Sequence, residues 1–127
     1  MDALRRALGG LSGIYALVFF AAVLLHAGVS LGPLRQPVVV PAAIVETLCG
    51  AAMLAGAYGA LAGRWWAWDG LIYAHATALS GVLLGILAIA LGRSAAMNPP
   101  LIAYHGTIAT LLTGGLGAAF YVSRVRR

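Results

Sequence analysis

The sequence predicts an all-α integral membrane protein, built as a single four-helix transmembrane bundle. Of its 127 residues, 62% are hydrophobic and only 9% are charged, and the mean hydropathy is +0.96. A soluble domain carries about 25% charged residues, so this composition indicates a chain that is solvated by lipid. One crossing needs about 20 apolar residues. Four crossings therefore use nearly the whole chain, and we expect one domain, 1–127, with no separate soluble part.

The first two crossings are separated by a proline-containing connection. The first is expected over residues 10–30, an apolar stretch that begins after a short basic segment. Pro33 and Pro37 keep the connection non-helical, because proline lacks the backbone N–H that a helix interior needs. Pro41 can occupy the first turn of the second crossing, 41–61, where a missing N–H does no harm.

The last two crossings are bounded by glycine and proline. Gly63 closes the second crossing, and the third is expected over residues 70–91, ending at Gly92. The fourth is expected over residues 101–122, directly after Pro100. Because all connections are short, an up-down-up-down arrangement is the simplest topology.

Arginine placement predicts how the bundle is oriented. Six of the eight basic residues fall on the side of the two termini and only two on the other side, and cytoplasmic loops carry the excess of positive charge. Both termini are therefore expected in the cytoplasm. The use of arginine without lysine, with many alanines and glycines, favours a bacterial inner membrane protein. The net charge of +5 is a topology signal, and we expect no nucleic-acid partner. The six are Arg5, Arg6, Arg64, Arg124, Arg126 and Arg127; the two are Arg35 and Arg93.

Glu46 is the most informative residue, because it lies within an apolar stretch long enough to cross a bilayer. A carboxylate at membrane depth is costly and normally has a partner. His26 lies about four residues before the outer end of the first crossing, and Glu46 and His105 about five residues after the outer starts of theirs. At 1.5 Å per residue, each would lie ~6–9 Å below the outer boundary. The three side chains can converge if they face inward.

Three interpretations of this cluster stay open on the sequence. It can be a buried hydrogen-bond network that fixes helix packing, with Tyr104 nearby. It can be a ligand or proton-transfer pocket, since a carboxylate beside two imidazoles can exchange protons with a lipid-soluble substrate. It can also hold a metal or a haem, because Glu46, His26 and His105 suit zinc, copper or iron, and Cys49 is close to Glu46. The spacing matches no known ligand signature, so we expect no metal.

His75 stands apart from this cluster. It lies about five residues into the third crossing from the cytoplasmic side, at a different depth. The favoured interpretation is a packing histidine, and the alternative is the cytoplasmic end of a proton path. Asp69, on the same helix, is expected to pair with Arg64.

Small residues at four-residue spacing predict close helix contacts. Such rows let helices approach each other in lipid. The longest row is expected to pack within the bundle, with contact to another subunit as the alternative. It comprises Gly106, Thr110, Gly114 and Ala118.

The segment from Pro41 onward carries a family resemblance. It reads PAAIVETLCGAAMLAGAYGALAGRWWAW. This stretch resembles the core of the DoxX-like membrane proteins. That core has a proline, a glutamate and two glycines in the second crossing, followed by an arginine-led turn into the third. The resemblance covers about half of the chain, whereas HAGVSLG and NPPLIAYHG, in the first and fourth crossings, depart from that core. The matching residues are Pro41, Glu46, Gly50, Gly56, Arg64 and Ala67.

The resemblance implies a small four-helix membrane unit. Founding members of that family are tied to quinone-linked sulfur oxidation, as small subunits of membrane complexes. It therefore implies a redox-linked accessory subunit, but it names no substrate, because a shared fold does not fix a function.

We accordingly expect an accessory subunit or a small-molecule-binding unit with quinone or lipid as ligand in an outer-leaflet pocket. One alternative is a membrane-embedded isomerase or oxidoreductase that uses the same cluster. Another is a structural or assembly subunit. Whether the protein is an enzyme is left open. The expected partners are the lipid bilayer, a small hydrophobic ligand, and a homo-oligomer or larger membrane complex.

Overall fold

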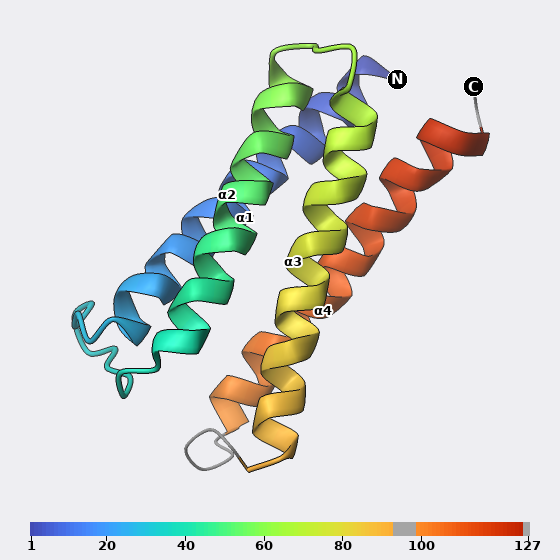
Figure 1. Ribbon diagram of the computed structural model, residues 1–127. Helices are drawn as coiled ribbons and strands as arrows, with labels where there is room; N and C mark the ends of the chain where they lie inside the picture. The colour runs from blue at the N-terminus through green and yellow to red at the C-terminus, as the bar shows by residue number, and fades with distance from the viewer. Residues whose placement is uncertain (93–98, 126–127) are drawn as a thin grey trace.

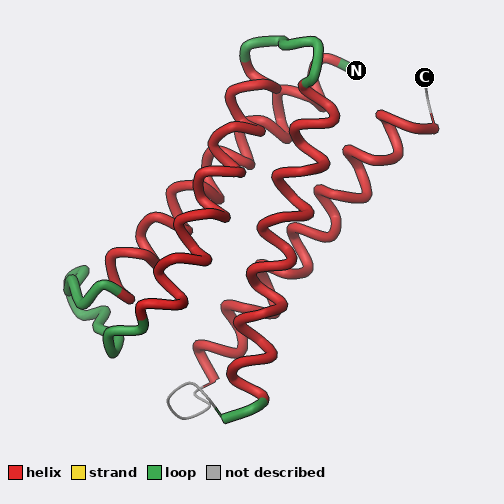
Figure 2. Tube along the Cα trace, viewed as in Figure 1, coloured by secondary structure: helices red, strands yellow, loops and turns green. Residues whose placement is uncertain are grey.

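In the computed structural model the chain forms four long helices joined by short connections (Figure 1). Residues 1–92 and 99–125 are described. Across them, helix dominates and strands are absent (Figure 2). All four helices are long and apolar enough to cross a membrane, which confirms the all-helical prediction. They are α1, Asp2–His26; α2, Val40–Leu61; α3, Ala67–Ala90; and α4, Pro99–Phe120, which a π-helical turn, Tyr121–Val125, continues.

Consecutive helices run in opposite directions, so both termini and the α2–α3 connection lie at one end of the bundle (Figure 1). The α1–α2 connection lies at the other end, called the loop end below. Helix α1 packs mainly on α2, and α4 packs mainly on α3, while α1 and α4 barely meet. The helices therefore follow one another in space in chain order.

Two clusters of buried side chains form the core. Small residues allow α2 and α3 to approach closely: a Cβ added at Gly56 would lie only 2.7 Å from the Cβ of Ala74. The larger cluster fills the middle of the bundle, and the smaller one lies nearer the termini. The larger consists of Tyr15, Ala16, Phe19, Cys49, Met53, Ala74, Ala78, Val82, Ile108 and Leu112, and the smaller of Leu8, Ala60, Leu71 and Ala119.

Helix α1 has other bounds than the first crossing that the sequence predicts. Helix α1 begins at Asp2 and ends at His26, whereas residues 10–30 were expected. The end is set by Gly28, whose φ of +90° suits glycine and stops the helix. The next residue folds back, and the Val29 N–H donates to the Leu24 carbonyl at 2.9 Å. This glycine-terminated turn makes His26 the last helical residue.

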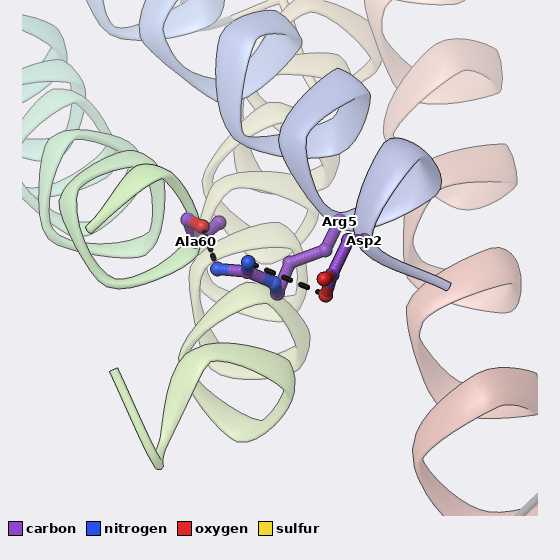
Figure 3. A network of polar contacts seen from close by, with 3 residues as sticks. All are labelled: Asp2, Arg5 and Ala60. Carbon is purple, nitrogen blue, oxygen red and sulfur yellow. Dashed lines mark hydrogen bonds and ion pairs between the residues drawn. The ribbon is translucent and has the colours of Figure 1, made fainter. Parts of the chain in front are cut away.

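The early start of α1 has a different cause. Arg5 lies between the first turn of α1 and the end of α2 (Figure 3). Its Nη1 donates to the Ala60 carbonyl, and its Nη2 lies 3.4 Å from the Asp2 carboxylate. Carbonyls in the last turn of a helix lack partners within that helix, so Arg5 satisfies one of them. These contacts keep the charged first residues of α1 helical. A hydropathy pattern alone would not assign these residues to the helix.

Two expected contacts are also corrected. Asp69 pairs with Arg124, at 3.0 Å between Oδ1 and Nη2, because the π-helical turn after α4 brings the arginine to the start of α3. Most of the longest small-residue row does not pack within the bundle, although Ala118 packs against the smaller core cluster. A Cβ added at Gly106 or Gly114 would meet nothing within 4 Å, whereas one at Gly115 would collide with the His75 imidazole. The contact of α4 with α3 is therefore made at Gly115, one residue after Gly114 of the expected row.

Candidate functional site

The structure brings His26 and Glu46 into direct contact. His26 Nδ1 lies 2.8 Å from Glu46 Oε2, and the side chains are only 19% and 15% exposed. The α1–α2 connection folds back so that the Val39 N–H donates to the His26 carbonyl at 3.0 Å. This bond sets the start of α2 beside the end of α1, which brings the second turn of α2 within reach of the histidine side chain.

The same geometry corrects the position expected for His26 within its helix. It is the terminal residue of α1 rather than one four residues inside the helix. Side chains lean toward the N-terminus of their own helix. The imidazole of His26 therefore leans into the bundle, while Glu46, on an antiparallel helix, leans toward the loop end. The two groups meet although their backbones lie at different depths.

Next to this pair lies a cavity of about 420 Å³ to which all four helices contribute. Its volume is within the roughly 300–1,000 Å³ typical of small-molecule sites. Apolar side chains form most of its wall, among them Phe19, Val45 and Val82. The polar groups at its edge include His26, Glu46 and His105, so the cavity unites the three residues that the sequence singled out.

His105 reaches the cavity from the second turn of α4. Its Nδ1 lies 2.8 Å from the Leu101 carbonyl. The other ring nitrogen, Nε2, points toward α3 at Gly85, where an added Cβ would be 2.9 Å away. Glycine at position 85 therefore leaves room for the imidazole.

The secondary candidates Tyr104 and Cys49 also border the cavity. Tyr104 packs edge-on against the His105 ring, with centroids 5.2 Å apart. The buried Cys49 thiol lies 3.9 Å from the Thr77 carbonyl, within reach of a weak hydrogen bond across to α3. Tyr104 therefore supports the histidine, and Cys49 supports the packing of α2 on α3.

His75 lies outside this site, in the core between α1 and α4. It is fully buried, its Nδ1 bonds the Leu71 carbonyl at 2.8 Å, and its ring stands edge-on to Tyr15 at 6.3 Å. His75 Nε2 and the Tyr15 hydroxyl are both buried without a hydrogen-bond partner among the described residues. Packing against Gly115 of α4 closes off the Nε2 edge of the ring. This placement agrees with the packing interpretation.

The arrangement of donors does not favour a metal. Within residues 1–92 and 99–125, no three His, Cys, Asp or Glu side chains are grouped closely enough to hold a metal ion. His26 and Glu46 bond to each other, and the Nδ1 of His105 bonds to backbone. The site instead combines a carboxylate–imidazole pair with a second imidazole at the edge of an apolar cavity.

Sequence reasoning missed the glycines that let side chains of α2 and α4 pack against α3 at the cavity. Gly81 and Gly85 border the cavity one helical turn apart. An added Cβ at Gly81 would collide with the Cys49 sulfur. Their four-residue spacing was visible, but it predicts a packing row equally well. A glycine that only packs one helix on another differs from a glycine at the cavity by the side chain that faces it from the other helix. A single sequence does not show which side chain that is.

No family model, no curated protein and no solved structure matches this chain. The geometry of the cavity is therefore what indicates a function. A mostly apolar wall can accommodate a hydrocarbon body, and the polar edge can bind one polar group and exchange a proton with it.

Proposed function

We propose that this protein is a multi-pass protein of the bacterial inner membrane, with both termini in the cytoplasm, that binds a small hydrophobic ligand. The ligand is a quinone or a lipid, and it occupies the cavity beside His26, Glu46 and His105. The observation that carries the proposal is the position of the His26–Glu46 pair at the edge of an apolar cavity between four membrane-length helices.

The position of the cavity supports entry from the bilayer. Leu84 borders the cavity and is itself 56% exposed. A ligand dissolved in lipid can therefore reach the cavity without crossing water. The accessory-subunit role is proposed from the DoxX-like pattern around Glu46 alone. A fusion reporter at the C-terminus that is active only in the cytoplasm tests the orientation, and activity on the outside would contradict it.

A second candidate function is a membrane-embedded isomerase or oxidoreductase. It is favoured by the 2.8 Å contact between His26 Nδ1 and Glu46 Oε2, because a proton held between two basic atoms is available for transfer to a bound substrate. In that case Glu46 accepts or delivers the proton and His26 positions it.

Native mass spectrometry of the intact protein, released from mild detergent, tests ligand binding. The wild-type protein is expected to carry an added mass that organic extraction identifies as a quinone or lipid. Glu46→Gln keeps the shape of the side chain and removes its charge, and it should reduce the bound fraction about tenfold, as expected for a lost charge-assisted hydrogen bond.

Thr110→Val is the matched control. The Thr110 hydroxyl is exposed and, among residues 1–92 and 99–125, bonds only to the Gly106 carbonyl of its own helix, at 2.9 Å. This variant should retain the wild-type adduct. A wild-type protein with only its chain mass, which also fails to take up added quinone or lipid, would refute the proposed function.

A further inference from the structure

The hydrogen bonds of His105 fix which of its ring nitrogens carries the proton. The Leu101 carbonyl can only accept, so the Nδ1 that lies 2.8 Å from it must donate an N–H. In the neutral imidazole the other nitrogen, Nε2, then has no hydrogen and is an acceptor. Nε2 has no hydrogen-bond partner among the described residues, and unlike the His75 Nε2 it is not sealed from contact.

His75 provides an internal comparison. Both histidines donate Nδ1–H to the carbonyl four residues earlier, at 2.8 Å in each case. His75 is fully buried in the core, and its Nε2 edge is closed by Gly115. His105 Nε2 also packs against a glycine, Gly85, but this imidazole borders the cavity and its Nε2 is not fully buried. The same local hydrogen bond therefore occurs twice. At His75 the Nε2 atom is buried in the core, and at His105 it is accessible from the cavity.

The neighbouring pair adds acceptors to the same end of the cavity. When His26 donates its Nδ1–H to the Glu46 carboxylate, its Nε2 is also an acceptor, and so is the second carboxylate oxygen. The Tyr104 hydroxyl can either donate or accept. The imidazole and carboxylate groups at this edge therefore present mainly hydrogen-bond acceptors to the cavity.

We propose that the cavity selects an amphiphile whose polar end is a hydrogen-bond donor, a hydroxyl group on an apolar body, and that His105 Nε2 accepts its hydrogen bond. This inference rests on the proposed function and names its ligand class. A ligand with only carbonyl or ether oxygens would leave the Nε2 acceptor desolvated and unpaired. Of a quinone couple, the hydroxylated reduced form meets this requirement and the oxidised form does not.

Matched probes of equal size test the inference. Binding of 4-nonylphenol is compared with binding of its methyl ether, by titration of the detergent-solubilised protein followed by native mass spectrometry. Dodecanol and its methyl ether form a second pair, which distinguishes an aromatic from an aliphatic source of the hydroxyl. We expect each hydroxyl compound to bind roughly tenfold more tightly than its ether, as for one buried hydrogen bond.

Variants assign the preference to His105. His105→Phe should bring the hydroxyl and the ether probes to nearly equal affinity, while Thr110→Val keeps the difference. Gly85→Ala provides a second route should the first variant fail to fold. Its methyl group would lie 2.9 Å from Nε2, so it should weaken the hydroxyl probe more than the ether.

The outcomes separate the two proposals. Equal affinities in the wild-type protein would overturn the donor requirement while leaving the cavity as a binding site. A preference that survives both His105→Phe and Gly85→Ala would overturn the role of Nε2. Failure of all four probes to bind would overturn the proposed function itself.

Discussion

Gly114 and Gly115 are neighbours on α4 that face different surroundings, and this makes a quantitative test of the packing. A Cβ added at Gly115 would collide with the His75 imidazole, whereas one added at Gly114 would meet nothing within 4 Å. Alanine in place of a mid-helix glycine stabilises a helix by roughly 0.5–1 kcal/mol. Gly114→Ala should therefore raise the free energy of unfolding by about that amount.

Gly115→Ala has the same gain in helix propensity but must displace a fully buried ring. Extra methyl groups in a well-packed core cost roughly 1–3 kcal/mol. Because the propensity gain is common to both variants, the Gly115 variant should be less stable than the Gly114 variant by about 1–3 kcal/mol. The assay is equilibrium unfolding in mixed micelles of mild detergent and SDS, followed by circular dichroism. Equal stabilities of the two variants would refute the packing of His75 against α4.

Two further predictions concern the ends of the bundle. The first is a double-mutant cycle of His26→Gln and Glu46→Gln, measured by the same unfolding assay. The coupling free energy should be about 1.5–3 kcal/mol, as for hydrogen bonds to charged groups. Additive effects of the two substitutions would show that the pair does not interact. Arg5→Ala removes the donor to the Ala60 carbonyl and should lower the free energy of unfolding by about 0.5–1.5 kcal/mol, whereas Arg6→Ala, at an exposed neighbour, should change it little. Equal effects of the two arginine variants would contradict the role of Arg5 at the end of α2.

The number and order of the helices could be predicted because hydropathy and length alone determine which segments fit a bilayer. The bounds could be predicted less well, because they depend on specific groups. Gly28 ends α1 through a positive φ that glycine permits, and a glycine at that place was a readable signal. The start at Asp2 depends on Arg5 reaching the Ala60 carbonyl, a contact between residues far apart in the chain.

The candidate site could be predicted in part for a related reason. A buried carboxylate needs a partner, so Glu46 pointed to the histidines at its own depth. Which atoms bond depends on how each helix is rotated about its own axis. A sequence does not give this rotation unless the positions of the neighbouring helices are known. The same limit explains why Gly114 and Gly115 could not be told apart, although only Gly115 contacts His75. It also explains why the contribution of Gly85 to the cavity was missed.

Photoaffinity labelling shows whether a hydrophobic ligand occupies the cavity beside Glu46 and His105. The probe is an alkylphenol with a diazirine near the hydroxyl group, applied to the protein in lipid nanodiscs and mapped by peptide mass spectrometry. We expect labels on the α2 and α4 peptides that contain Glu46 and Tyr104. Unlabelled alkylphenol should compete with this labelling, and Glu46→Gln should abolish it. Labels confined to outward-facing residues such as Leu48 and Leu111, which excess alkylphenol fails to displace, would contradict occupancy of the cavity.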